Sequence, residues 1–545
     1  MKKIALLIVL CLALSCQNKE EVDTIIFNAQ VYTVNQDFAI AEAFAIKDGK
    51  FIDVGTTKKI TDTYQSQNTI DLKGKPIFPG LIDAHCHFYG MGMNQQTVDL
   101  VGTRNFDDVM KRVLDFNNQT QPRQIEARGW DETDWEDKTL PTNMLLNRLF
   151  PDMPVILRRV DGHAAICNQA ALDLGKITVN TKVDGGEIEV KDGKLTGILI
   201  DNAVDLVLDQ WPQPTNKEIS KGLLDAQAIC SKFGLTTVDD AGLEPEIIDM
   251  IDQMQKEGSL KTRVYAMVSN SPKNLDIYLN KGIYKTDRLN VRSFKVYADG
   301  ALGSRGALLR APYQDKDNHF GLLLTPVSEL TEIAGRIAKS DFQMNTHAIG
   351  DSANHLLINT YEKALEGQND RRWRMEHAQV IASDDFSKFN NILPSVQPTH
   401  ATSDMYWAEE RLGEERIKGA YAYKQLLDAY GKIALGTDFP VEQVNPFLTF
   451  YAAVGRQDLK GFPEGGFQME NHLSREETLK GMTIWAAYSN FEENEKGSIE
   501  IGKLADFVIL DQDLMTVEVE KIPQTKVLQT VIGGEVVYES ESLAK

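Results

Sequence analysis

The sequence has few cysteines, a deficit of positive charge, and no apolar run long enough to cross a membrane as a helix. Five cysteines occur in 545 residues, and the three beyond residue 16 are too few and too scattered for a disulfide framework. The formal net charge of −21 argues against nucleic acid or an anionic membrane surface as a partner. A Gly-x-Ser-x-Gly motif is also absent, so nothing indicates a serine nucleophile of that kind.

The first sixteen residues have the order of an export signal. Two lysines precede the apolar run 4–14, which is too short to span a bilayer. The sequence Ala13-Leu14-Ser15-Cys16 resembles a lipoprotein processing site, in which the cysteine carries the lipid. We therefore expect a signal peptide over 1–16, a tether over 17–23, and export with a lipid anchor on Cys16, on the periplasmic or surface side of a bacterial membrane. The alternative is a plain signal peptide without lipid.

Several apolar or β-branched segments end in a side chain that can bind a metal ion. The first ends in His85 and His87, and residues two apart on a strand point to the same face. Two such imidazoles can hold one ion, although this pair alone is a weak signal. The signal becomes strong because later segments of the same kind end in or carry, in chain order, Lys295, His347, His377 and Asp438.

This order is typical of a parallel barrel, which places its active-site groups at the carboxyl ends of its strands. Further strand-like segments at 236–240, 263–268 and 393–397 complete the set, and helical patterns lie between them. The sequence therefore predicts an α/β fold, a (β/α)8 TIM barrel, over residues 77–496. A chain of 545 residues is long enough for such a barrel and a satellite domain.

The two ends of the chain are rich in short strand-like runs with turn residues between them. We expect residues 24–76 and 497–545 to form one small β-sandwich built from both termini. The gap between the first and second barrel strands is far longer than an ordinary βα connection. An inserted subdomain is therefore predicted at about 90–232.

The strand ends and the terminal β-rich segments resemble the amidohydrolase superfamily, in its binuclear-metal subtype. The resemblance extends over nearly the whole chain after residue 16. It is close to the branch that includes the YtcJ-like proteins and N-substituted formamide deformylase. It implies six metal ligands, none of which departs from the family's pattern: His85, His87, Lys295, His347, His377 and Asp438.

The resemblance also implies how these ligands are shared between two divalent metal ions. His85, His87 and Asp438 would hold one ion, and His347 and His377 the other. Lys295 would bridge both as a carbamate formed with carbon dioxide. Its alternative is an ordinary buried ion pair with a carboxylate. Imidazole and carboxylate donors favour zinc, although manganese, iron or nickel fit the same ligands.

The implied reaction is attack on a carbonyl carbon by a metal-activated hydroxide, with Asp438 as the catalytic residue that moves the proton. We expect a hydrolase that acts on a C–N bond of a small-molecule amide, formamide or cyclic amide. A lactone or ester hydrolase on the same site is one alternative, and a non-catalytic binding protein is another. The sequence leaves open whether the chain forms a homodimer.

Four further residues are candidates for substrate binding. Trp130 and His163 lie in the predicted insert and equally suit a role in holding it together. Arg305, in the loop after the fourth strand, could pair with a substrate anion, but pairing with a loop carboxylate is favoured. His400 follows the seventh strand and is expected at the barrel mouth.

Overall fold

The computed structural model describes residues 19–541, so the predicted signal peptide and Cys16 lie outside the described residues. The chain divides into two compact units. Within the described residues, the first consists of 19–86, 228–245 and 261–541, and the second of His87–Gln227 and Glu246–Leu260. Among residues 19–541, no helix has both the length and the apolar character needed to cross a membrane.

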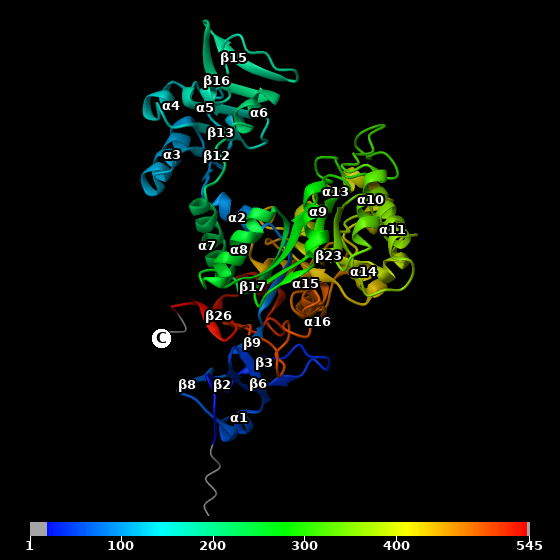
Figure 1. Cartoon of the computed structure of the whole chain (residues 1–545). Helices are drawn as coiled ribbons and strands as arrows, with labels where there is room; N and C mark the ends of the chain where they lie inside the picture. Colours follow the sequence, from blue (N-terminus) through cyan, green and yellow to red (C-terminus); the bar gives the residue numbers. More distant parts are fainter. Residues whose placement is uncertain (1–18, 542–545) are drawn as a thin grey trace, which may run out of the picture. The chain divides into compact units, whose positions relative to one another are not determined.

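Eight parallel strands form a nearly closed barrel in the first unit (Figure 1). In order around the barrel they are β10 (Leu81–Cys86), β17 (Leu235–Leu243), β18 (Arg263–Ser269), β20 (Leu289–Tyr297), β21 (Gln343–Ala348), β22 (Arg374–His377), β23 (Leu393–Val396) and β24 (Ala434–Leu435). The segment after the last strand is joined to the first strand by a hydrogen bond, which the Asp438 N–H donates to the His85 carbonyl at 2.8 Å. The predicted α/β class and TIM barrel are confirmed.

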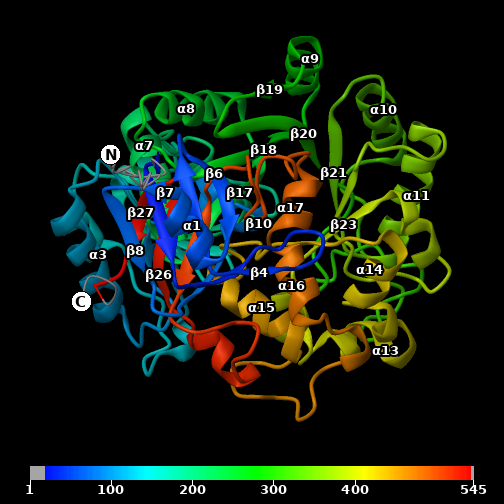
Figure 2. The ribbon, with the colours of Figure 1, turned by 90° about the horizontal axis from the view of Figure 1, so that it is seen from below.

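Helices cover the outside of this barrel. Figure 2 shows α10 (Val327–Ile337), α11 (Asp351–Leu365) and α14 (Tyr423–Tyr430) outside the strands. The buried side chains of α10 recur at intervals of three and four residues, which gives the helix one apolar face toward the strands. A later helix, α16 (Arg475–Gly481), begins with a capping box formed by Ser474 and Glu477.

Two small sheets are built from both ends of the chain. One has the order β6-β5-β2-β8 and the other β27-β26-β25-β9-β3-β4. Their strands are β2 (Thr24–Phe27), β3 (Gln30–Tyr32), β4 (Ile40–Ala41), β5 (Ala43–Lys47), β6 (Lys50–Gly55), β8 (Asn68–Asp71), β9 (Pro76–Pro79), β25 (Phe507–Leu510), β26 (Val527–Ile532) and β27 (Glu535–Glu539). Phe44 packs edge-on against Phe51 and Phe507, so residues from the two termini share one core.

Residues 20–22, which lie within the predicted tether 17–23, are part of the fold. The strand β1 (Glu20–Glu21) pairs in parallel with β7 (Tyr64–Gln65), and Val22 is buried in the same small core as Ile60. These contacts follow from the apolar character of Val22, which has a hydrophobic neighbour to pack against. The tether is therefore shorter than expected at its carboxyl end.

The second unit contains a sheet of its own, of order β11-β12-β13-β14-β16-β15. Its central strands are β12 (Ile125–Trp130), β13 (Val155–Arg159), β14 (Ala164–Cys167) and β16 (Lys194–Asp201), and its edge strands are β11 (Val98–Asp99) and β15 (Gly186–Lys191). The helix α3 (Phe106–Thr120) packs its apolar residues against this sheet. The unit also holds α2 (Phe88–Asn94), α7 (Asn216–Lys232, in part) and α8 (Pro245–Lys256, in part).

Candidate active site

The carboxyl ends of the barrel strands bring the predicted ligands of the first unit together. The imidazole rings of His85 and His347 have their centroids 4.9 Å and 4.5 Å from that of His377. Lys295 Nζ lies 3.0 Å from His85 Nε2, and Asp438 Oδ1 lies 3.8 Å from the same nitrogen. Residues from five different strands or strand ends thus converge on one small space, as the barrel geometry requires.

Two groups of donor atoms meet at Asp438. His85, His87 and Asp438 form one group, and His377, His400 and Asp438 form the other. Within each group, one possible ligand atom of every residue lies within 4.8 Å of the others. The second group differs from the expected one, because it contains His400 with His377 in place of His347. The His347 ring nevertheless lies beside that of His377, with centroids 4.5 Å apart. Asp438 is common to both groups, so one carboxylate can serve two neighbouring ions.

The protonation and burial of these side chains fit a divalent cation. Burial, reinforced by the charge of Lys295, lowers the pKa of His85 to about 4 and that of His347 to about 3. At neutral pH both imidazoles are therefore neutral and have a lone pair to donate. His347 Nε2 and His400 Nε2 are also buried without a hydrogen-bond partner in residues 19–541. Buried nitrogens of this kind are costly unless a ligand satisfies them.

Hydrogen bonds to Nδ1 of two histidine rings fix which ring nitrogen carries the lone pair that can bind a metal ion. His85 Nδ1 lies 2.5 Å from a carboxylate oxygen of Glu376, and His377 Nδ1 lies 2.7 Å from Gln397 Oε1. In each pair the imidazole N–H donates, which leaves Nε2 as the lone-pair nitrogen. Metal-binding histidines generally have such partners, which hold the ring and raise its basicity.

A buried charge network continues behind Glu376. Arg374 Nε donates to Glu376 at 2.6 Å, Arg374 Nη1 donates to Asp239 at 2.9 Å, and all three side chains are fully buried. Burial by itself would raise the pKa of Glu376, but Arg374 and His85 hold it below its usual range. Glu376 therefore stays an anion facing His85. Burial raises the pKa of Asp239 to about 7, against the opposing effect of Arg374.

Two further carboxylates hold the backbone around the site. Asp83 accepts hydrogen bonds from the Thr437 N–H and hydroxyl at 3.0 and 2.7 Å, which ties β10 to the segment that carries Asp438. Asp299 accepts three backbone N–H groups in the loops after β20 and β21, from Leu308, Ile349 and Gly350. Burial raises the pKa of each carboxyl to about 7. Both residues act on the site through the backbone.

The sequence analysis missed most of these supporting residues. Glu376 is adjacent to His377, and Asp83 lies two residues before His85, so both stand next to predicted ligands. A strand places residues i and i+2 on one face, and this rule would have pointed to Asp83. Arg374, Asp239 and Gln397 lie far apart in the chain and carry no comparable local signal.

The substrate-binding candidates have different outcomes. The prediction for Trp130 is wrong, because its side chain is 0% exposed in the core of the insert and its indole N–H donates to the Leu157 carbonyl. Arg305 pairs with both carboxylate oxygens of Asp315 at 3.1 and 2.7 Å, which is the alternative favoured for it. His163 is exposed and pairs with Asp201 at 2.8 Å, and its contact with substrate stays a prediction.

His400 lies close to the predicted metal ligands. It stands in the first turn of α12 (Pro398–Asp404), and its ring stacks on His377 with centroids 6.0 Å apart. His400 Nε2 is 3.8 Å from Asp438 Oδ2. Its position suits contact with a bound substrate or with a metal ion.

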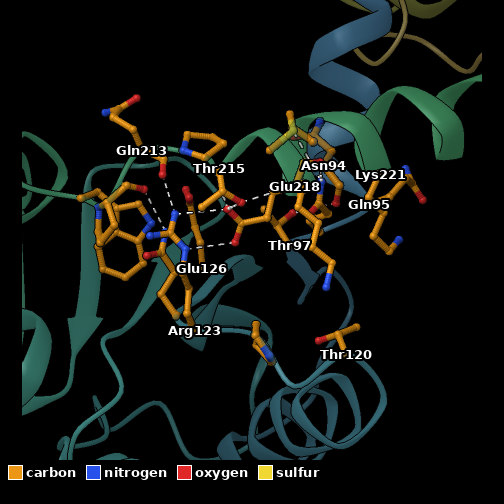
Figure 3. Close-up of a pocket in the computed structure, with 18 of the residues that line it drawn as sticks. Asn94, Gln95, Thr97, Thr120, Arg123, Glu126, Gln213, Thr215, Glu218 and Lys221 are labelled. Atoms are coloured by element: carbon orange, nitrogen blue, oxygen red, sulfur yellow. Dashed lines mark hydrogen bonds and ion pairs between the residues drawn. The ribbon is translucent and has the colours of Figure 1, made fainter. Parts of the chain in front are cut away.

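A separate cavity of about 980 Å³ lies in the second unit (Figure 3). Arg123 and Glu218 form an ion pair at 3.1 Å in its wall, and the Thr215 N–H donates to Glu218 at 2.7 Å. Trp211 and Phe116 supply apolar surface. None of the predicted metal ligands lines this cavity, so its size does not make it the catalytic site.

Comparison with known proteins agrees with this geometry. The sequence profile of the amidohydrolase family matches residues 68–538. The YtcJ protein of Bacillus subtilis is 30% identical over 93% of this chain and 98% of its own length. N-substituted formamide deformylase of Arthrobacter pascens is 24% identical over 95% of this chain and 98% of its own length.

A solved structure shares both fold and sequence with the chain. It is that of an uncharacterized metal-dependent hydrolase from Pyrococcus horikoshii, with a TM-score of 0.78 and 28% identity, and the match covers 91% of this chain and 99% of that one. The resemblance noted from the strand-end residues is thereby confirmed. The chain belongs to the amidohydrolase family, and it is a metal-dependent hydrolase.

Proposed function

We propose that the chain hydrolyses a C–N bond in a non-peptide amide, a formamide or a cyclic amide. The observation that carries the proposal is the position of Asp438, which is shared by two groups of imidazole donors. Burial lowers the pKa of one histidine in each group, His85 and His377, and so keeps these two rings neutral. A carboxylate placed between two metal-binding groups can move a proton where a water attacks a carbonyl. The similarity to N-substituted formamide deformylase over 95% of the chain supports an amide or formamide as the substrate class.

The residues of the two groups have different proposed roles in metal binding and proton transfer. His85, His87 and Asp438 would hold one ion, and His377 would hold the second with His347 or His400. The chemistry of these donors favours zinc. Two divalent ions held by them would lower the pKa of a water molecule toward neutrality and would polarise a carbonyl group. Asp438 accepts the proton of the attacking water and returns it to the leaving nitrogen. Glu376 and Gln397 keep His85 and His377 in the tautomers that bind.

Lys295 is proposed to react with carbon dioxide and to act as a carbamate. Its side chain is fully buried, and burial lowers the pKa of its amine to about 8. A larger fraction of the amine is therefore uncharged near neutral pH than for an exposed lysine. The uncharged amine is the form that attacks carbon dioxide, and Lys295 already lies against His85.

Protein loaded with zinc and bicarbonate is expected to contain about two metal ions per chain and to hydrolyse members of a formamide and cyclic-amide panel. Elemental analysis measures the metal, and ammonia, amine or formate release measures turnover. Removal of the metal with a chelator should abolish the activity, and added zinc should restore it. Cleavage of lactones or esters alone would shift the assignment to a C–O hydrolase. Metal-free protein with full activity would refute the proposal.

We also propose that Cys16 anchors the exported protein to a membrane through a lipid. The support is the order of lysines, an apolar run and a small residue before Cys16. The Cys16→Ala variant should leave the membrane fraction and should no longer incorporate radiolabelled palmitate, whereas the wild-type chain should stay in the membrane fraction and incorporate the label. A Cys86→Ala variant is a matched control, because Cys86 is buried in β10. Unchanged membrane fractionation of Cys16→Ala would count against the anchor.

A further inference from the structure

Tyr297 stands level with the predicted metal ligand His347 and follows the ligand Lys295 along the same strand. It is the last residue of β20 and lies two residues after Lys295, so both side chains point to the same face of the strand. Its register partner on the neighbouring parallel strand is His347. Lys295 is 1% exposed and Tyr297 is 41% exposed, as expected for a residue nearer the carboxyl end of the strand.

The tyrosine ring is held over the site. Its centroid is 5.8 Å from that of His347 and 5.1 Å from Lys295 Nζ. The Tyr297 carbonyl accepts a hydrogen bond from the Thr325 hydroxyl at 2.6 Å, and the next residue, Ala298, donates to the His347 carbonyl at 2.9 Å. These bonds fix the backbone on both sides of the residue, so the ring is positioned by the barrel itself.

The phenol hydroxyl has no hydrogen-bond partner within residues 19–541, although it stands among polar groups. It reaches toward the end of β17, where a Cβ added to Gly242 would come within 3.4 Å of it. Gly242 has a φ of +106°, a backbone conformation that favours glycine. Because glycine has no side chain, the space next to the hydroxyl stays open. A phenol O–H is a hydrogen-bond donor at neutral pH, and within residues 19–541 no acceptor is bonded to this one.

We propose that the Tyr297 hydroxyl donates a hydrogen bond to the carbonyl oxygen of the substrate and binds it more strongly as negative charge develops there. This inference rests on the proposed hydrolysis of a carbonyl compound. The electron pair of the C=O double bond moves to its oxygen as the C–O bond to water forms, and the donor stabilises that oxygen. A donor that acts mainly in the transition state raises kcat more than it lowers KM.

Tyr297→Phe tests the inference, because it removes the hydroxyl and keeps the ring. The variant is expected to lower kcat by about 10²–10³-fold with little change in KM, which is the usual cost of one such donor. Metal content and melting temperature should not change, since the hydroxyl has no partner to lose. Tyr406→Phe is the matched control, because the Tyr406 hydroxyl is exposed and bonded to Asp458. A kcat of Tyr297→Phe equal to that of the control would overturn the inference.

A binding measurement separates failure of this inference from failure of the proposed function. Calorimetric titration of metal-loaded protein with methylphosphonate, whose tetrahedral anionic oxygens resemble the transition state, needs no turnover. Tyr297→Phe should bind it about tenfold more weakly than wild type, the effect of one hydrogen bond to a charged oxygen. That loss in a protein inactive on every amide would support Tyr297 as the donor and reject amide hydrolysis. Equal affinity of wild type and variant, or no binding to either, would overturn the role of Tyr297.

Discussion

Replacement of Asp438 by asparagine is expected to lower turnover by roughly 10²–10⁴-fold, the usual contribution of a positioned proton-transfer group. Asp438 lies 3.8 Å from both His85 Nε2 and His400 Nε2 and belongs to both donor groups. An amide keeps one ligand oxygen but cannot accept the proton of the attacking water. Activity should therefore fall much further than metal content.

The asparagine variant is a clean test because it does not strain the backbone. Asp438 has a φ of +62°, in the left-handed region that Asp and Asn tolerate better than most residues. Its N–H donates to the His85 carbonyl, and this bond survives the substitution. Turnover, metal content and melting temperature are measured together, with Asp276→Asn, at an exposed ion pair with Arg336, as the control. A folded, metal-loaded Asp438→Asn protein with near-normal turnover would contradict the assigned role.

The barrel and its ligand positions could be predicted because they depend on local patterns. Each strand is a short apolar run, and its functional side chain stands at or just after the carboxyl end, as for His347 in β21 and His377 in β22. Parallel strands of a barrel bring those ends to one rim whatever the loops between them do. The strand-end positions of His85 and Lys295 therefore predict one shared rim, and in the structure Lys295 Nζ lies 3.0 Å from His85 Nε2.

The arrangement within the site could not be predicted from strand periodicity. Glu376 and His377 are neighbours and should point to opposite faces of β22, yet both face the site. His377 has a φ of +73°, so the chain leaves strand geometry at this residue and the imidazole turns back toward the barrel axis. Local strain of this kind is concentrated at functional sites and leaves no mark on the hydrophobic pattern.

Trp130 is a case in which a local motif suggested a substrate contact that the structure does not show. A large aromatic residue in a motif near the barrel suggested a substrate pocket, but the residue ends β12 and fills the core of the insert with Trp135. The composition of a strand does not tell which of its faces meets a second layer. The partners of Arg374 are equally hidden, because Asp239 is 135 residues away in the chain and only the closed barrel brings the two together.

Replacement of Arg374 by methionine is expected to destabilise the folded protein by about 3–5 kcal/mol, the usual cost of removing one partner from a buried ion pair. Arg374 is fully buried and donates to Glu376, Asp239, the Ser395 hydroxyl and the Ala84 carbonyl. Methionine fills much of the volume but leaves two buried carboxylates without their cation. Because Glu376 also orients His85, metal binding should weaken as well.

The measurement is urea unfolding of metal-free protein followed by circular dichroism, with metal affinity determined separately. Arg336→Met is the matched control, since Arg336 pairs with Asp276 at the surface and such a pair contributes about 0–1 kcal/mol. Arg374 joins β22 to β10, β17 and β23 through its partners, so its loss loosens four strands of the barrel at once. An Arg374→Met protein as stable as the control would show that the two carboxylates are accommodated without their cation, and that the network does not hold the barrel together.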